Sequence, residues 1–211
     1  YMKKLVIIGA GGYAKSVIDS LLPGQYELCG FIDLYKAVKG DVHLGYPILT
    51  SSIQELQNPE QYCYFICIGN NMDRKSYFDY LIENNYEVIS VVDRTAMVSS
   101  NSKLGTGVFI GKLAIVNSGA VVGNNSILNT RSLTEHGCCI GSHVNLSTNA
   151  VINGDVVVED GGFIGSCSVV NGQVRIGAWA TIGSGAVVVH NVSPHDTVVG
   201  IPAKSLKRRS S

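Results

Sequence analysis

The hydrophobic positions of the carboxyl-terminal half recur every six residues. Counting in sixes from Val98 to Val188 meets an aliphatic residue at every position except Thr134, which is polar. Two residues before each counted position stands a residue that is never large, so a second column keeps the same phase. Neither an α-helix nor an ordinary strand has a period of six. The pattern predicts a β-solenoid in which each six-residue piece forms one short strand and one turn.

In such a solenoid, equivalent residues of successive coils stack at the strand spacing of roughly 4.8 Å. The aliphatic column fills the interior, the small residues fit the corners, and three pieces complete a coil, which predicts about five coils. Glycine or asparagine follows many aliphatic positions, and we predict that these residues adopt left-handed backbone conformations in the turns. They are Gly105, Gly111, Gly123, Gly141, Gly165, Gly177 and Gly183, with Asn117, Asn129, Asn153 and Asn171.

The amino-terminal half has a different rhythm, in which apolar runs alternate with helical patterns. Strands are predicted over residues 4–8, 26–33, 62–68 and 87–92, and helices over residues 13–22 and 73–83. Strands that alternate with helices form a small parallel sheet covered on both faces. We therefore predict two domains: a Rossmann-like α/β domain over residues 2–92 and the solenoid over residues 96–205.

Composition and charge narrow the function. Sixteen Lys and Arg balance sixteen Asp and Glu, so the chain has no field for holding a polyanion over a wide surface, and a nucleic-acid role is excluded. No apolar run is long enough to span a membrane. The six cysteines form no CxxC pair and no zinc spacing, so no metal site is predicted, and we interpret them as reduced core thiols of a cytoplasmic protein.

The first predicted turn carries a nucleotide-binding pattern. Gly9-x-Gly11-x-x-Ala14 follows a strand, and Asp33 ends the next one. Glycines there permit close approach of a phosphate to the start of a helix. A nicotinamide oxidoreductase is one reading, but a domain of about 90 residues has room for one mononucleotide half only. In another reading the glycines serve only strand–helix packing.

The repeat, with its small residue two places before each aliphatic one, resembles the hexapeptide signature of left-handed β-helix acyltransferases. The glycine-rich first domain and the closing Gly200-Ile201-Pro202-Ala203-Lys204 extend the resemblance to the PglD/NeuD type, which acetylates bacterial sugars. The resemblance implies acetyl-CoA as co-substrate, a nucleotide sugar as partner and a homotrimer with acyl-CoA in clefts between subunits.

His136 is the candidate general base, because it follows the one polar break in the aliphatic column, at Thr134. Imidazole titrates near neutral pH and suits removal of a proton from an attacking amine or hydroxyl. In the resembling family an acidic-His-acidic triplet carries the catalytic histidine. Glu135 and His136 match its first two places, but Gly137 stands at the third. Glu135, Asp155 or a carboxylate of a neighbouring subunit could support the histidine, and the alternative is that His136 merely occupies a polar turn.

Further contacts with acetyl-CoA follow from the resemblance. A gapless overlay places a second, acetyl-CoA-contacting histidine on Asn145, and two more such positions on Ser166 and Ser184. Lys204, in the family-like Pro-Ala-Lys motif, is expected to pair with the phosphates of coenzyme A, and Lys207, Arg208 and Arg209 extend this basic cluster.

Two other side chains invite rival interpretations. We interpret His143 as a solvated turn residue. Cys138 suggests a covalent acyl-enzyme, but it stands in the small-residue column that points inward, which favours direct transfer.

For the first domain, the resemblance places the nucleotide part of a UDP- or GDP-sugar on one set of residues. These are Gly11, Gly12, Tyr13, Asp33, Leu34 and Gly69. Tyr13 stands where relatives commonly have histidine.

The leading functional hypothesis is acetylation of the amine of a nucleotide-linked 4-amino sugar in bacterial surface glycan biosynthesis. O-acetylation of a sialic acid uses the same machinery on a hydroxyl. A non-catalytic nucleotide-sugar-binding solenoid is the alternative of a different class.

Overall fold

The computed structural model describes residues 2–35 and 41–206. The chain forms two compact units, Tyr1–Val91 and Val92–Ser211, and the division falls within β7 (Val91–Val92). No helix among the described residues is long and apolar enough to cross a bilayer. The basic residues Lys207, Arg208 and Arg209 named from the sequence lie outside the described residues.

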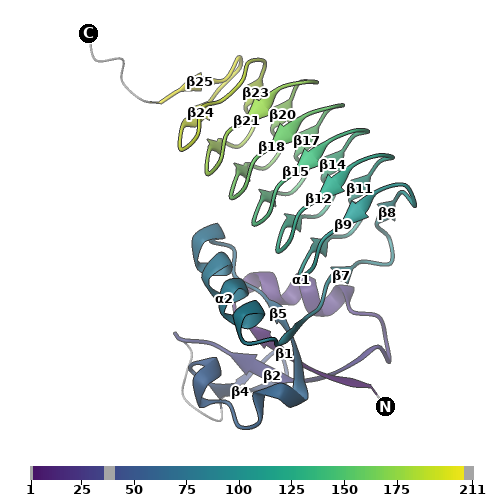
Figure 1. Ribbon diagram of the computed structural model, residues 1–211, viewed down its shortest axis with the longest axis vertical. Helices are drawn as coiled ribbons and strands as arrows, with labels where there is room; N and C mark the ends of the chain where they lie inside the picture. Colours follow the sequence, from purple (N-terminus) through teal and green to yellow (C-terminus); the bar gives the residue numbers. More distant parts are fainter. Residues whose placement is uncertain (1, 36–40, 207–211) are drawn as a thin grey trace. The chain divides into compact units, whose positions relative to one another are not determined.

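The first unit is a mostly parallel sheet with strand order β3-β4-β2-β1-β5-β6. Its helices are α1 and α2, with the short 3-10 turns η1 and η2 between β4 and β5 (Figure 1). The elements are β1 (Lys3–Ile8), α1 (Gly12–Ser20), β2 (Tyr26–Ile32), β3 (Val42–His43), β4 (Tyr46–Thr50), η1 (Ile53–Glu55), η2 (Pro59–Gln61), β5 (Tyr62–Ile66), α2 (Asn71–Glu83) and β6 (Glu87–Val88).

The sequence located the central elements of this unit and missed its edge. The predicted strands and helices match β1, β2, β5, α1 and α2, because each has a continuous apolar run or a helical face. The β3–β4 pair was not predicted, since one strand has two residues and the other contains Pro47. The predicted strand over 87–92 was wrong: β6 and β7 are separate and belong to different sheets.

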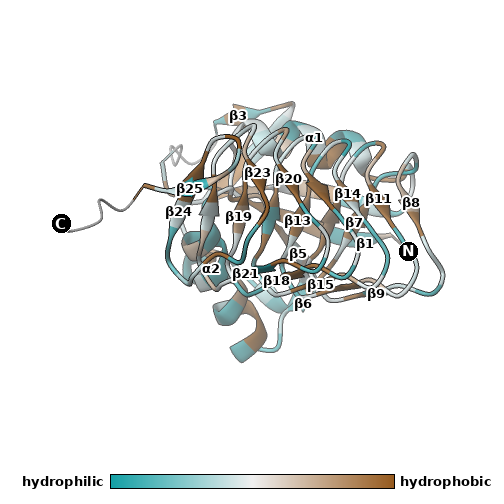
Figure 2. Cartoon of the chain, turned by 90° about the horizontal axis from the view of Figure 1, so that it is seen from above, coloured by the Kyte–Doolittle hydropathy of each residue, from teal (hydrophilic) through white to brown (hydrophobic). Residues whose placement is uncertain are grey.

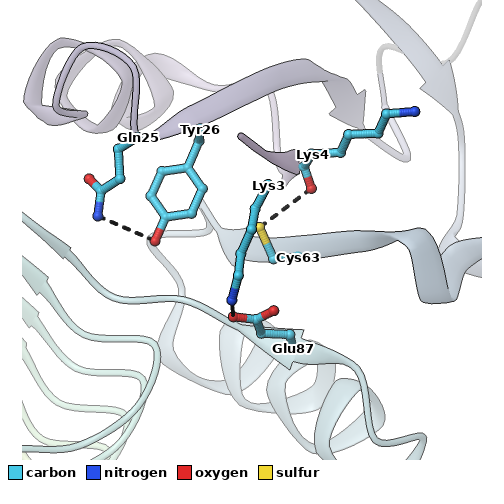
Figure 3. A network of polar contacts seen from close by, with 6 residues as sticks. All are labelled: Lys3, Lys4, Gln25, Tyr26, Cys63 and Glu87. Carbon is cyan, nitrogen blue, oxygen red and sulfur yellow. Dashed lines mark hydrogen bonds and ion pairs between the residues drawn. The ribbon is translucent and has the colours of Figure 1, made fainter. Parts of the chain in front are cut away.

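One end of the first sheet carries a polar network (Figure 3). Lys3 Nζ lies 2.5 Å from Glu87 Oε1 and so joins β1 to β6, while the Cys63 thiol donates to the Lys4 carbonyl at 3.4 Å. These residues lie at the amino-terminal ends of their strands and border an open cavity of about 520 Å³. Exposed ion pairs contribute little to stability, so the network fixes the register of the sheet edge rather than strengthening it greatly.

The second unit is a left-handed parallel β-helix whose strands are mostly two residues long. Its coils stack as successive layers from β8 to β24 (Figure 1). The first face has strand order β23-β20-β17-β14-β11-β8 and the second β21-β18-β15-β12-β9. Their bounds are β8 (Met97–Val98), β11 (Ile115–Val116), β14 (Leu133–Thr134), β17 (Val151–Ile152), β20 (Val169–Val170), β23 (Val187–Val188), β9 (Lys103–Leu104), β12 (Val121–Val122), β15 (Cys139–Ile140), β18 (Val157–Val158) and β21 (Arg175–Ile176).

The third face runs from β7 through β10 to β24 and ends in β25, which pairs antiparallel with β24. Partners in neighbouring coils are eighteen residues apart, as in the pair Phe109 and Ile127, except in the last coil, where Thr181 pairs with Thr197. The strands of this face are β10 (Phe109–Ile110), β13 (Ile127–Leu128), β16 (Asn145–Leu146), β19 (Phe163–Ile164), β22 (Thr181–Ile182), β24 (Thr197–Val199) and β25 (Lys204–Ser205).

The aliphatic column fills the interior of the β-helix, as the period predicted. Ile110, Leu128, Leu146, Ile164 and Ile182 are completely buried and stack one above another. Figure 2 shows the apolar strands separated by more polar turns around the coils. Burial of apolar side chains stabilises a fold by about 25 cal/mol per Å², so this column is the main source of cohesion between coils.

The prediction about the glycines that follow the aliphatic residues was wrong. They and the matching asparagines do not have positive φ; the left-handed residue is the third after the aliphatic one, for example Leu113 and Asn125. A Cβ on Gly165 would lie 2.5 Å from the Ser184 nitrogen, and one on Gly123 would lie 2.6 Å from the Gly141 carbonyl carbon. These glycines therefore permit close approach of successive coils rather than an unusual turn.

At one corner, the space left by such glycines holds side-chain oxygens. The Thr106 amide donates to Asn124 Oδ1 at 2.9 Å, and the Ser142 amide donates to Asp160 Oδ1 at 2.8 Å. A Cβ on Gly141 would lie 2.5 Å from that Asp160 oxygen. Backbone amides that the strand ladder leaves unpaired are thus satisfied from the next coil.

The cysteines are all free, but the prediction that all are core thiols was wrong for three of them: Cys29 is half-buried and two others are exposed. Cys139 precedes the aliphatic position of β15 and faces outward, and Cys167 is a left-handed turn residue; both are exposed. Cys63, Cys67 and Cys138 are buried, and burial raises the pKa of each thiol.

Candidate functional site

His136 stands in the turn between β14 and β15, with 65% of its side chain exposed. The next coil places Gly154 beneath the imidazole: a Cβ there would lie 2.5 Å from His136 Cε1 and 2.7 Å from Nε2. The imidazole can therefore occupy this position only because residue 154 has no side chain. The ring is held against backbone on one side and open to solvent on the other, as a group that must meet a substrate requires.

Asp155 is the acid that faces this ring. Its Oδ1 lies 4.0 Å from His136 Nδ1, and its backbone amide donates to the His136 carbonyl at 3.0 Å. A Cβ on Gly137 would lie only 2.1 Å from the same carboxylate oxygen. The glycine that interrupts the expected acidic-His-acidic triplet is thus the residue that makes room for Asp155.

Glu135 turns toward the backbone instead. Its Oε2 accepts the His136 amide at 3.2 Å. Among the described residues, the carboxylate that comes within ion-pair distance of the His136 ring is that of Asp155.

The polar break at Thr134 does not belong to the site. Thr134 is completely buried between Val116 and Ile152 of the neighbouring coils, so its side chain points into the prism. Its Oγ1 has no hydrogen-bond partner among the described residues. The interruption of the aliphatic column lies next to the turn that carries His136, but the Thr134 side chain belongs to the interior of the prism.

Cys138 is also interior. It is completely buried, and its thiol donates to the Asn153 carbonyl at 3.1 Å. Burial raises its pKa, which keeps the thiol protonated and unreactive. The position supports direct transfer over a covalent acyl-enzyme.

The interpretation of His143 as a solvated turn residue was wrong. Only 7% of it is exposed, and its Nδ1 lies 2.9 Å from Asn125 Nδ2, one coil earlier in the same left-handed column. Asn145 is buried too, with 8% exposed, and its Oδ1 has no hydrogen-bond partner among the described residues. Positive φ at residue 143 marks a turn, but it says nothing about solvent.

Ser166 and Ser184 share one corner, the turn after β19 and β22, and the Gly185 amide donates to the Ser166 carbonyl at 2.8 Å. His136 lies at another corner, after β14 of a different face. Lys204 is exposed on β25. Within one chain, the structure therefore does not bring these three residues to the corner of His136.

The first unit has a cavity of about 420 Å³ at the carboxyl ends of β1, β2 and β5. This is where a parallel sheet binds ligands. Gly11, Asp33 and Leu34, three residues named from the sequence, line it; Gly12, Tyr13 and Gly69 are not among its described lining residues. The other described lining residues are Ile8, Gly9, Ile32, Tyr35, Cys67, Ile68, Asp73, Ser76 and Tyr77.

Asp33 ties the glycine loop to the end of β2. Its Oδ2 accepts the Ala10 amide at 2.6 Å, and its Oδ1 accepts the Tyr35 amide at 2.9 Å. Gly9 has φ +99°, and a Cβ there would lie 2.7 Å from the Cys67 carbonyl oxygen, so no other residue fits. The loop between β1 and α1 is therefore fixed before any ligand arrives.

The acidic lining of the cavity limits the kind of ligand that can bind there. Asp33 and Asp73 are its charged lining residues, and no Lys or Arg is among those described. Carboxylates accept hydrogen bonds from N–H and O–H groups and repel phosphate. The cavity suits a nucleoside, while α1 begins beside it at Gly12 with no acidic residue in its first turn, where a phosphate is favoured.

The sequence analysis missed Arg74, which is 1% exposed. Its Nη1 donates to the carbonyls of Ile68 and Gly69 at 3.1 and 3.2 Å, and its Nη2 donates to Asn71 Oδ1 at 2.8 Å. Burial lowers its pKa to about 10. Arg74 fixes the loop between β5 and α2 that contains Gly69.

A sequence signal for this burial existed. Arg74 shares the helix face of Phe78 and Leu81, at spacings of four and three residues, and both are buried.

Tyr13 is half-buried, and enclosure of its hydroxyl raises its pKa well above the usual value. No cluster of three or more metal-ligating side chains occurs among residues 2–35 and 41–206.

The chain is similar to known proteins over both units. The PglD N-terminal domain family matches residues 4–81. The acetyltransferase domain of PglB from Neisseria gonorrhoeae FA1090 is 29% identical, with a TM-score of 0.89, and the match covers 97% of this chain and 100% of that one. The same domain has also been solved in complex with acetyl coenzyme A, at 28% identity, a TM-score of 0.88 and coverage of 98% and 100%.

A second similar structure is that of perosamine N-acetyltransferase from Caulobacter crescentus. It was solved as a histidine-to-asparagine variant in complex with CoA and GDP-perosamine. It is 27% identical, with a TM-score of 0.89, and the match covers 97% of each chain. These similarities extend beyond the repeat to the first unit, and they make this protein a hexapeptide-repeat acyltransferase. Within that class, the chain is similar to the sugar acetyltransferases of the PglD/NeuD type.

Proposed function

We propose that this protein transfers the acetyl group of acetyl-CoA to the amine of a nucleotide-linked amino sugar, with His136 as general base. The observation that carries the proposal is the exposed imidazole on the turn after β14, held over Gly154 and faced by Asp155. The similarity to an N-acetyltransferase solved with CoA and GDP-perosamine supports the substrate class. The proposed setting is bacterial surface glycan biosynthesis in the cytoplasm.

The chemistry follows from the position of the base. The amine nitrogen attacks the thioester carbonyl while His136 takes the proton that the nitrogen loses. The carbon–sulfur bond breaks, and the proton passes from the imidazolium to the CoA sulfur, which leaves as the thiol. Backbone amides at Ser166 and Ser184, with the Asn145 side chain, are proposed to hold acetyl-CoA, and Lys204 to meet its phosphates.

His136 lies at one corner of the β-helix, and Ser166 and Ser184 lie at another. Because a single chain does not bring them together, we propose that the site is completed between neighbouring subunits of a homotrimer. The nucleoside occupies the cavity of the first unit beside Asp33 and Leu34, and the diphosphate lies at the start of α1 beside Gly11, Gly12 and Tyr13. Gly69 belongs to the loop that Arg74 fixes on the other side.

The test is detection of the acetylated product by mass spectrometry, with acetyl-CoA and a panel of UDP- and GDP-linked amino sugars plus sialic acid. We expect turnover of a nucleotide-linked amino sugar and a fall in kcat of at least about 100-fold for His136→Ala. His190→Ala is the matched control, since His190 is an exposed histidine at the same corner three coils away.

Three other outcomes contradict parts of the proposal. Undiminished turnover in His136→Ala removes His136 as the base. Turnover restricted to free sialic acid replaces N-acetylation by O-acetylation. Binding of acetyl-CoA without turnover of any acceptor favours a non-catalytic solenoid.

A further inference from the structure

His136 and Asp155 lie in two neighbouring coils, and each packs against a glycine of the other coil. His136 stacks on Gly154, and Gly137 stacks on Asp155. A Cβ on Gly154 would collide with the imidazole at 2.5 Å, and one on Gly137 would collide with the carboxylate at 2.1 Å. Each side chain thus fills the space that the glycine of the other coil leaves open. The carboxylate of Asp155 occupies the place where a side chain following His136 would begin.

The backbone fixes this arrangement. Gly137 and Asp155 both have left-handed conformations, with φ of +67° and +58°, so the two turns have the same shape. The Asp155 amide donates to the His136 carbonyl at 3.0 Å, and the Gln173 amide continues the ladder to the Gly154 carbonyl at 3.0 Å. The acid is therefore placed by the stacking of coils and not by a long loop.

The ring atoms that meet the acid decide what it can do. Asp155 faces Nδ1, which leaves Nε2 as the other ring nitrogen. A neutral imidazole that carries its proton on Nδ1 has its lone pair on Nε2, so it can accept the proton of the substrate at Nε2. At 4.0 Å the pair is longer than a hydrogen bond, and 65% of the imidazole side chain and 56% of the carboxylate side chain are exposed, so both can move closer.

Glu135 is the natural comparison. It is adjacent to His136, but its carboxylate accepts the His136 backbone amide and does not face the ring. Of the two carboxylates in this turn region, Asp155 is the one across from the imidazole.

We infer that Asp155 is a positioning residue that holds His136 in the tautomer with the proton on Nδ1, and that Gly137 is required because it admits the Asp155 carboxylate. This inference rests on the proposed function only for its effect on turnover. The tautomer of the free protein can be measured without any substrate.

The first test is Asp155→Asn, which keeps the size of the side chain and tolerates a left-handed backbone. We expect kcat to fall about 10- to 100-fold while KM for acetyl-CoA changes less than about 3-fold. Glu135→Gln is the matched control and is expected to stay within about 3-fold of the parent in kcat. Loss of kcat in Glu135→Gln with none in Asp155→Asn overturns the inference.

The second test moves the acid between coils. Asp155→Gly should lose the same activity, and adding Gly137→Asp should restore at least about 10-fold of it, because the new acid starts in the vacated space. Gly137→Asp alone should lower activity, since the parent carboxylate already fills that space. A merely structural role for Asp155 predicts no rescue, and absence of rescue in a folded double variant contradicts the inference.

The third test separates this inference from the proposed function. Nitrogen-15 NMR of the imidazole in the free protein, with the signal assigned by its loss in His136→Ala, reports which nitrogen carries the proton. We expect the Nδ1-protonated tautomer in the parent and its loss in Asp155→Asn. If no acceptor is acetylated but the tautomer depends on Asp155, the proposed function fails and the inference stands. If turnover is found but Asp155→Asn leaves the tautomer unchanged, the inference fails alone.

Discussion

The position of the His136 side chain depends on two glycines without side chains. The imidazole packs over Gly154, and the Asp155 carboxylate fits against Gly137. His136 could be named from the sequence because its turn follows the one polar member of the aliphatic column. Asp155 was only one of three possible acids, since a distance of nineteen residues becomes a contact only when the length and stacking of a coil are known. Arg74 was missed because an arginine within a helix is usually a surface residue.

Thr134 offers a test of interior packing that leaves the proposed catalytic residues unchanged. Thr134→Val keeps the shape of the side chain and removes a buried hydroxyl that has no hydrogen-bond partner among the described residues. Because an unpaired buried hydroxyl is costly, we expect the free energy of unfolding to rise by about 1 kcal/mol.

Urea unfolding of Thr134→Val and the parent measures this difference. Ser126→Ala is the contrasting control, because the Ser126 hydroxyl donates to the Gly141 carbonyl at 2.9 Å and accepts the Val144 amide at 3.0 Å. That variant should be destabilised. A loss of stability in Thr134→Val would instead show that its hydroxyl has a partner.

The elements of the β-helix were predictable in position but not in every cause. The six-residue period located the two-residue strands because burial of one aliphatic residue per piece leaves a direct trace in the sequence. The glycines after those residues were assigned to left-handed turns, whereas their role is to let coils approach. Sequence alone does not distinguish a glycine needed for its positive φ from one needed for its missing Cβ, because the residue is glycine in both cases.

Gly165 and Gly185 separate the two roles of glycine by experiment. Gly165→Ala places a Cβ 2.5 Å from the Ser184 nitrogen and 2.6 Å from the Ile182 oxygen, both backbone atoms. We expect it to lower the free energy of unfolding by about 2 kcal/mol or more, because two coils must separate.

Gly185→Asn is the matched substitution. Gly185 has φ +71°, which asparagine tolerates, and no atom lies within 4 Å of its added Cβ. Thermal unfolding of both variants should show a clear loss for the first and a change of less than about 0.5 kcal/mol for the second. Equal losses would mean that turn conformation, and not close approach, governs this corner.

At the scale of the whole molecule, two units carry two cores. The residues packed around Val6 and Tyr64 form a core of the first unit, and the aliphatic column forms that of the second. The cavity beside Asp33 lies in one unit and His136 in the other. The hydrophobic period of the sequence changes from that of strands and helices to six close to this division. The partners of each site residue could not be predicted, because they are set by register and packing.

The division predicts separable kinetic effects. Asp33→Asn keeps one acceptor oxygen where the parent uses two, for the Ala10 and Tyr35 amides, so the glycine loop loses an anchor. We expect KM for the nucleotide sugar to rise about 10-fold and KM for acetyl-CoA to change less than about 2-fold. Steady-state kinetics with each substrate varied in turn measures this, with Asp41→Asn as a control at an exposed acid of the same unit. A parallel rise in both KM values would contradict separate substrate sites.

The eighteen-residue spacing of partners has a consequence for how such a chain can diverge. An insertion of one residue within a strand would turn the aliphatic side chain of that strand outward, whereas a duplicated coil would keep all such side chains inside. The solenoid can therefore lengthen by whole coils without disturbing its core, each coil adding roughly 4.8 Å. A coil gained after β23 would leave His136 and Asp155 untouched and would shift only the closing strands β24 and β25. The distance along the solenoid between the proposed catalytic pair and the closing strands is thus set by the number of coils, which can change one coil at a time.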